Sequence, residues 1–155
     1  MLYMFEESVE SFTARWRKAA AEAYIFPRVE NDPLLELEAA GVIFHAMERT
    51  GPYLPSVGPG HVIVHALAED AQVLHAPVAQ MEVTGISRAR ISGRITHVEA
   101  PFLVVDAGFP VVTGILSQDF SKYRVDAFVA FDVLPPLQAF VLVADSVRRV
   151  HDFEV

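Results

Sequence analysis

The sequence predicts a single α+β domain in which an N-terminal helix packs on a mainly antiparallel β-barrel. Its length of 155 residues is the common size of one domain. A helical apolar stripe runs through the first 26 residues, whereas residues 81–144 alternate strand-like segments with turn residues. We therefore expect helical and strand segments over 1–80, the barrel core over 81–144 and a C-terminal tail over 145–155.

Composition limits the classes of function. The chain carries 20 acidic and 12 basic side chains, a net charge of -8, which disfavours binding to nucleic-acid backbones and anionic lipids. Cysteine is absent, so disulfides, thiolate metal sites and cysteine nucleophiles are excluded. The 52% share of hydrophobic residues predicts spare apolar surface and hence a homodimer. The opening residues lack the basic side chains of a secretory signal, and no apolar run reaches the roughly 18 residues of a membrane span. We expect a cytoplasmic protein without a membrane segment or a cofactor.

The first element is expected to be a helix from Phe5 to Phe26, ended by Pro27. Its apolar side chains recur at alternating steps of four and three residues, which places them on one helical stripe: Phe5, Val9, Phe12, Trp16, Ala19, Ala23 and Phe26. An aromatic stripe of this kind is typical of a helix that packs on a core.

The next segment has two interpretations. Asp32 can cap a helix, and Pro33 suits the first helical position. In the interpretation that we favour, Gly41 ends this helix and residues 42–49 form a strand. In the other, one helix continues to Gly51, because the apolar residues keep a helical spacing: Leu35, Ala39, Val42 and Ala46.

Residues 50–60 contain three prolines and three glycines, which predicts a loop. Residues 61–68 (HVIVHALA) are expected to form a strand. Residues 72–80 are expected to pair with it, interrupted by Pro77, which suits an edge of the sheet.

From Met81 to His97 the alternation is regular, with five apolar side chains on one face: Met81, Val83, Ala89, Ile91 and Ile95. A straight strand of this length would exceed about 50 Å at ~3.3 Å per residue, too long for a domain of this size. The chain is therefore expected to bend at Gly85 or Gly93.

Four further strands are expected. Residues 102–107 and 110–116 form a pair joined by a tight turn. Residues 125–133 and 137–144 are apolar on both faces, which predicts burial on both sides. Pro135-Pro136 is the predicted turn between them.

Glycines and apolar residues recur in a particular order within residues 93–120: Gly93, Ile95, Val98, Val104, Val105, Gly108, Gly114, Ile115 and Leu116. This order resembles the first three barrel strands of the OB-fold subclass typified by the RNA-binding repeats of a ribosomal protein. The resemblance implies a five-stranded barrel closed by 125–133 and 137–144. Two features depart from the subclass. Its usual glycine is missing ahead of the fourth strand, near Arg124, and its surface aromatic cluster has only Phe102 as a counterpart.

Three arginines and one phenylalanine are the candidate nucleic-acid interface: Arg88, Arg90, Arg94 and Phe102. The arginines share one strand face at a spacing that suits successive phosphates of a single strand, and the aromatic ring offers a base-stacking platform. The alternative is a solvated face on which the arginines pair with Glu82, Asp126 or Asp132, and the excess of acidic over basic side chains favours it.

Histidines suggest a metal site only if the chain folds back. His61 and His65 on one strand lie about 13 Å apart, whereas ligands lie about 2 Å from a shared ion. A hairpin centred on Asp70 would instead place His65 opposite His75, a pair that could bind zinc with a third ligand or respond to pH near 6.5. A shift of one residue in register would separate them.

The nearest approach to an acid–base cluster is His97 beside Glu99, with Asp106 on the following strand. The sequence supplies no nucleophile motif, P-loop or dinucleotide-binding glycine motif. We therefore expect a non-catalytic binding or self-assembly module. One alternative is single-stranded nucleic-acid binding through the arginine face.

The other alternative depends on a continuous helix from Pro33 to Arg49. A sheet wrapped around such a helix would be similar to a hot-dog fold, whose members often act on acyl thioesters as dimers. Glu36 or Glu48 would then be the candidate carboxylate base.

Overall fold

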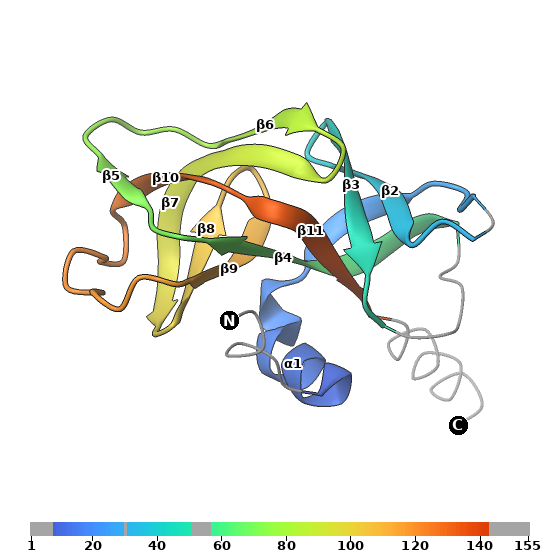
Figure 1. Ribbon diagram of the computed structural model, residues 1–155, viewed down its shortest axis with the longest axis horizontal. Helices are drawn as coiled ribbons and strands as arrows, with labels where there is room; N and C mark the ends of the chain where they lie inside the picture. The colour runs from blue at the N-terminus through green and yellow to red at the C-terminus, as the bar shows by residue number, and fades with distance from the viewer. Residues whose placement is uncertain (1–7, 30, 51–56, 143–155) are drawn as a thin grey trace, which may run out of the picture.

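The computed structural model describes residues 8–29, 31–50 and 57–142. Within them the chain forms one α-helix, one 3-10 helix and an 11-stranded sheet (Figure 1). The helices are α1 (Val9–Trp16) and η2 (Arg17–Ala19). The strands are β1 (Ala21–Ile25), β2 (Leu34–Ala39), β3 (Val42–Glu48), β4 (Gly58–Ala68), β5 (Gln72–Leu74), β6 (Gln80–Gly85), β7 (Arg88–Glu99), β8 (Phe102–Asp106), β9 (Pro110–Ile115), β10 (Phe128–Asp132) and β11 (Leu134–Val141). The predicted tail over 145–155 lies outside the described residues.

Five strands close into a barrel. β1, β2, β3, β11 and β4 are neighbours in that order, and β4 pairs again with β1. These pairings are antiparallel except that of β3 with β11. The structure thus confirms the predicted fold class, an N-terminal helix with a mainly antiparallel barrel. A closed five-stranded barrel is compatible with an OB-like fold.

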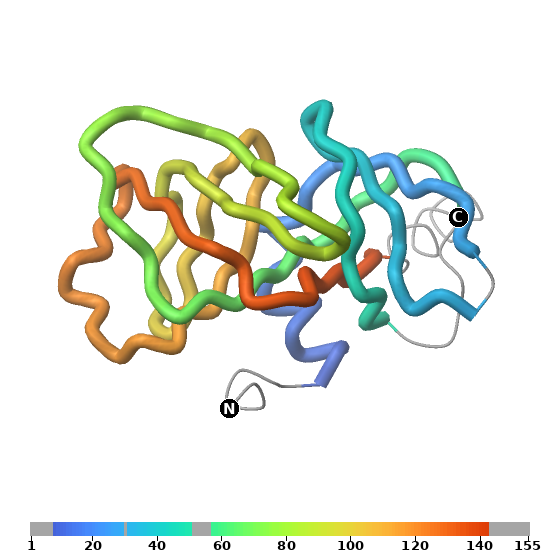
Figure 2. Tube along the Cα trace, turned by 45° about the horizontal axis from the view of Figure 1, so that its top comes forward, coloured from blue at the N-terminus to red at the C-terminus, as the bar shows by residue number. Residues whose placement is uncertain are grey.

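The closed barrel does not lie within residues 81–144, where the sequence predicts it. Of the strands from β6 onward, only β11 belongs to the closed ring. The remaining strands, together with β5, extend the sheet beyond β4 in the order β9-β8-β7-β10-β5, and β6 pairs with β7 (Figure 2). The expected barrel core over 81–144 is therefore corrected. Residues 21–68 supply four of the ring strands, because the segments predicted as helices there are largely strands.

The N-terminal helix is shorter than predicted. Its first turn is capped by Ser8, whose Oγ accepts the Ser11 N–H at 3.0 Å. Beyond Ala20 the chain becomes β1, in which buried and exposed residues alternate. Ala23 fits both the helical stripe and an alternating strand, and ladder bonds to both β2 and β4 favour the strand. In the described part of the chain, neither helix has the length and apolar character of a membrane span.

Residues 34–48 form a β-hairpin. The predicted helix after Pro33 is wrong, whereas the predicted strand over 42–49 is confirmed as β3. Ala40 and Gly41 both have positive φ angles, 50° and 81°, as a two-residue hairpin turn of type I′ requires. Gly41 therefore makes a turn between strands instead of ending a helix. The continuous helix required by the hot-dog alternative is absent here, so that alternative is dropped.

Two apolar clusters hold the fold together. The larger one fills the barrel and one face of the extension, and the smaller one lies on the opposite face, beneath α1. β4 contributes side chains to both clusters: Val62, Val64 and Ala66 belong to the larger one, whereas Ile63 and Leu67 belong to the smaller one. Burial on both faces explains why this strand is apolar at nearly every position.

The expected strands after residue 80 are largely confirmed. The single bent strand expected over 81–97 is corrected to a hairpin: β6 ends at Gly85, one of the two positions predicted for the bend, residues 86–87 form the turn, and the chain returns as the antiparallel β7. β8 and β9 form the predicted pair. The predicted turn at Pro135-Pro136 is wrong, because β10 pairs with β7 and β5 while both prolines lie within β11. They occupy a stretch where the register of β11 against β4 is interrupted, which suits residues that lack an N–H.

The loop before β10 is anchored by Tyr123. Its hydroxyl accepts the Ala71 N–H at 3.0 Å and donates to Asp70 Oδ1 at 2.5 Å. Burial, together with the bond to Asp70, raises the pKa of Tyr123 to about 12. The hydroxyl is therefore a fixed, neutral hydrogen-bonding group.

Replacing Tyr123 with phenylalanine is expected to lower the free energy of unfolding by about 1–3 kcal/mol, because the buried Ala71 N–H loses its partner. Urea unfolding followed by circular dichroism measures the loss. The matched control is Lys122→Ala, which removes an exposed ion pair with Asp70 and a contact of the ammonium with the Tyr123 ring, each worth less than about 1 kcal/mol. Equal losses in the two variants would contradict this role for the hydroxyl.

Candidate functional site

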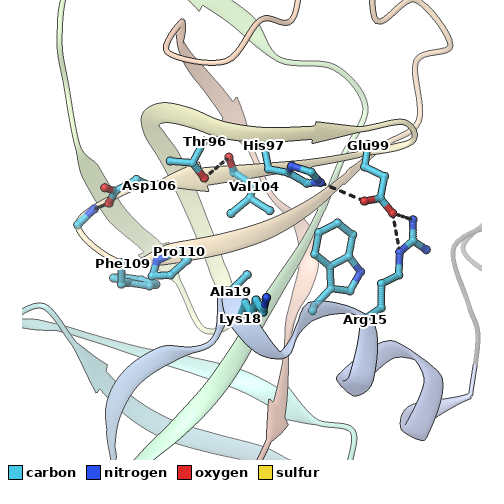
Figure 3. Close-up of a pocket in the computed structure, with 12 residues that line it drawn as sticks. Arg15, Lys18, Ala19, Thr96, His97, Glu99, Val104, Asp106, Phe109 and Pro110 are labelled. Atoms are coloured by element: carbon cyan, nitrogen blue, oxygen red, sulfur yellow. Dashed lines mark hydrogen bonds and ion pairs between the residues drawn. The ribbon is translucent and has the colours of Figure 1, made fainter.

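A groove of about 530 Å³ lies between the helical segment and the extension of the sheet. One wall comes from α1 and η2, with Arg15, Trp16 and Lys18. The other comes from β7, β8 and the turn into β9, and includes His97, Glu99 and Asp106. Figure 3 shows the two walls facing each other. The groove exists because α1 packs across strands that are more than 80 residues away in the sequence.

Glu99 joins the two walls. Its Oε1 lies 3.0 Å from His97 Nε2 on the same strand, and its Oε2 accepts bonds from Arg15 Nε at 2.9 Å and from the Arg15 terminal nitrogen at 2.5 Å (Figure 3). The bond from His97 and then that from Arg15 lower the pKa of Glu99. The carboxylate therefore stays charged and keeps both partners oriented toward it.

Trp16 forms the apolar part of the groove. Its ring packs edge-on against Phe102 at 5.3 Å and against His97 at 6.2 Å, and it is only 4% exposed. The Arg15 guanidinium lies over both aromatic rings, 5.0 Å from that of Trp16 and 4.9 Å from that of Phe102. Among the described residues, the indole Nε1–H has no hydrogen-bond partner. Trp16 therefore contributes a buried polar donor that is unpaired among the described residues.

The other end of the groove is shaped by the turn between β8 and β9. Asp106 accepts the Gly108 N–H at 2.9 Å, which closes the turn. Gly108 has a φ of +100°, a conformation that favours glycine. The buried ring of Phe109 follows, and Lys18 and Ala19 lie across from it in Figure 3. This end thus combines a carboxylate, an ammonium group and apolar surface.

The predicted acid–base cluster is assembled in part. His97 and Glu99 contact each other as expected. Asp106 lines the same groove, but in the ladder it lies opposite Arg94 and it binds its own turn. Sequence reasoning missed the helical wall. Arg15 and Trp16 are visible in the sequence only as parts of an amphipathic helix, and nothing local indicates which strands that helix covers.

The arginine face of β7 is ion-paired. Arg90 lies 3.3 Å from Asp132, and Arg94 lies 2.7 Å from Asp126, both on exposed side chains. The structure therefore contains two of the ion pairs that the alternative interpretation predicted. Phe102 is 2% exposed, because α1 covers its ring, so the proposed base-stacking platform is wrong. Arg88 is exposed at the start of the strand.

The predicted pairing of His65 with His75 is also wrong. β5 pairs with β10 instead of β4, so the expected hairpin does not form. His75 lies exposed at a bend, whereas His65 lies beneath α1, where its Nδ1–H donates to the Val112 carbonyl at 2.8 Å. Across the residues that the structure describes, no three metal-ligating side chains are grouped to hold an ion.

A second hollow, of about 520 Å³, lies on the outer surface of the barrel. It is lined by Glu22 and Tyr24 of β1, Glu38 of β2 and His61 of β4. Glu22 and His61 are direct cross-strand neighbours. Its side chains are more exposed than those of the groove, and it has no buried aromatic wall.

Comparison of the chain with protein-family models, with curated proteins and with solved structures gives no match. The candidate site therefore depends on its geometry alone.

Proposed function

We propose that the protein is a non-catalytic binding module that takes a small molecule into the groove between α1–η2 and β7–β9. The main support for this proposal is that positively and negatively charged side chains line the same groove beside a buried aromatic ring. Arg15 and Lys18 come from the helical side, and Glu99 and Asp106 come from the sheet. A concave apolar surface with a few placed polar groups is the usual form of a ligand site. The expected ligand has an apolar body and polar groups at its ends.

The groove favours binding over catalysis. His97 and Glu99 form an acid–base pair, but a nucleophile is also needed for covalent catalysis. Among the described lining residues, Thr96 carries the only hydroxyl, and it donates to the Val104 carbonyl at 3.3 Å. Of the polar groups in the groove, Glu99 contacts Arg15 and His97, whereas Thr96 and Asp106 bond to backbone atoms, as is typical of groups that orient a ligand.

Filling the groove is expected to abolish ligand binding. Thr96 is exposed on β7 and lines the groove, so Thr96→Phe places a ring in the space that the ligand would occupy. Ligand-observed NMR against a library of small amphipathic carboxylates, amines and amides measures binding. We expect at least one library member to bind the wild type and to lose at least tenfold in affinity in the variant.

The matched control is Thr84→Phe, which places the same ring at an exposed threonine on β6, outside the groove. It should bind like the wild type. Equal binding by Thr96→Phe and Thr84→Phe would place the ligand elsewhere and contradict the proposed site.

A second candidate function is self-assembly as a homodimer. Two large apolar side chains are exposed at the β6–β7 hairpin, Val83 at 43% and Ile86 at 72%, and Ile43 on the adjoining β3 is 51% exposed. β6 pairs with β7 alone, so its other edge is not hydrogen-bonded to a described strand. An unprotected edge beside exposed apolar side chains favours pairing with another chain.

Ile86→Lys is expected to convert the dimer to a monomer, because it places a charge in the centre of this surface. Sedimentation equilibrium measures the mass. Val29→Lys is the control, since Val29 is 67% exposed but lies between β1 and β2, far from the hairpin in the sequence. A wild type that is monomeric at high concentration, or a monomer in both variants, would contradict this surface.

Single-stranded nucleic-acid binding through the arginine face of β7 has less support. Two of its three arginines pair with carboxylates, and its aromatic ring is buried. The cytoplasmic location also stays a prediction.

A further inference from the structure

His65 occupies the interface between α1 and the sheet. Its ring lies 5.0 Å from Phe12 of α1, 6.1 Å from Phe102 of β8 and 6.4 Å from Phe140 of β11. The side chain is 4% exposed. Its Nδ1–H donates to the backbone carbonyl of Val112, so the described contacts of this histidine are aromatic rings and one neutral acceptor.

The surroundings of His65 disfavour its charged form. Gln138 is its neutral partner across the β4–β11 ladder. The charged group that acts on it is Arg49, just after β3, whose guanidinium lies 5.6 Å from the Phe140 ring. The charged side chains of α1, Glu10 and Arg15, are exposed, and Arg15 is paired with Glu99. Burial first, and then the positive charge of Arg49, lower the pKa of His65 from 6.5 to about 4, against the effect of the Val112 bond.

The helix is attached to the sheet mainly through this interface. Phe12 and Trp16 are its two buried side chains, and the ring of Phe12 stacks on Phe140 at 4.5 Å. The helix also contacts the sheet through the exposed Arg15–Glu99 pair, and exposed pairs of this kind contribute little to stability. Because the same segment supplies one wall of the groove, the groove exists only while α1 is docked.

We propose that protonation of His65 releases α1 from the sheet and thereby takes the groove apart, so that binding is switched off in acid. This inference rests on the proposed function only in its last step, because release of the helix is measurable without a ligand. Below pH 6.5 the released state takes up a proton that the docked state resists until about pH 4. Acidification over this range therefore shifts the docking equilibrium toward release, by roughly two orders of magnitude.

Trp16 reports on docking, since it is the only tryptophan of the chain and is buried in the interface. We expect its fluorescence maximum to move to longer wavelength between pH 6.5 and pH 4, while the far-UV circular dichroism of the sheet persists. Two variants remove the titrating group: His65→Gln retains a donor toward Val112, and His65→Phe retains a ring. The acid shift of the fluorescence maximum should be absent in each of these variants that folds.

Two control variants separate other acid-sensitive groups. His97→Gln removes the imidazole that lies 6.2 Å from the Trp16 ring and could itself alter the emission. Glu99→Gln removes the carboxylate that pairs with Arg15. Both should keep the acid shift. An unchanged shift in the folded His65 variant, its loss in either control, or simultaneous loss of the sheet signal in the wild type would overturn the proposal.

The same data keep the two proposals distinct. If the emission shift depends on His65 but no library compound binds at neutral pH, the switch stands and the binding function fails. If compounds bind at neutral pH and the shift is independent of His65, the binding function stands and the switch fails.

Discussion

Gly93→Ala is expected to lower the free energy of unfolding by about 4 kcal/mol or more, enough to unfold a marginal domain. A Cβ at this position would lie 2.0 Å from the Asp106 carbonyl oxygen, 2.6 Å from the carbonyl carbon and 3.0 Å from Val105 Cγ1. The nearest atoms are backbone atoms of β8, and β10 pairs with β7 on the other side at Val129. The strand is thus held from both sides and has no room to shift.

Gly85→Ala is the matched control. Its added Cβ would meet only side-chain atoms of Arg88, the nearest being Cδ at 3.2 Å, and an exposed arginine can move away. We expect a change of less than about 1 kcal/mol. Urea unfolding measures the stability of both variants. Similar unfolding midpoints for Gly93→Ala and Gly85→Ala would show that β7 does not approach the β8 backbone closely at Gly93.

Phe12→Ala is expected to release α1 at neutral pH. Removal of the ring abolishes its contacts with Trp16, His65, Phe102 and Phe140. Truncation of a buried phenylalanine costs about 3–5 kcal/mol, and an eight-residue helix with two buried side chains has little else to hold it. The sheet should persist, because its larger apolar cluster lies on the other face.

Trp16 fluorescence and hydrogen exchange of the α1 amides measure this release. Ala14→Ser is the control. It alters an exposed position on the same helix and lowers helix propensity by only about 0.5 kcal/mol. A Phe12→Ala variant that keeps Trp16 buried, or one that loses the whole sheet, would contradict the view that α1 docks as a separate unit.

The sequence predicts the extension of the sheet better than it predicts the barrel. Buried side chains alternate along most of β7, β8 and β9 are short apolar runs, and Gly85 and Gly108 lie at or beside the turns, so local pattern and tertiary structure agree. In β1 and β2 they do not. Ala23, Leu35 and Ala39 suit either a helical stripe or an alternating strand, and only pairing with distant strands decides between them. Local sequence carries no information about that pairing.

The candidate site is predictable only in its strand half. His97 and Glu99 are two residues apart, and their contact follows from the strand period. The contribution of Arg15 depends on how α1 packs across β7 and β8, a contact over 84 residues of sequence. The same packing buries Phe102 and His65, which explains why both the base-stacking and the metal interpretations failed.

The groove between α1–η2 and β7–β9 is the proposed binding site. Chemical-shift mapping of the ¹⁵N-labelled protein with the tightest library compound tests it most directly. We expect saturable shifts at the Trp16 indole N–H and at the amides of His97 and Gly108. Shifts confined to the barrel hollow around Tyr24 and His61, or none that saturate, would contradict it.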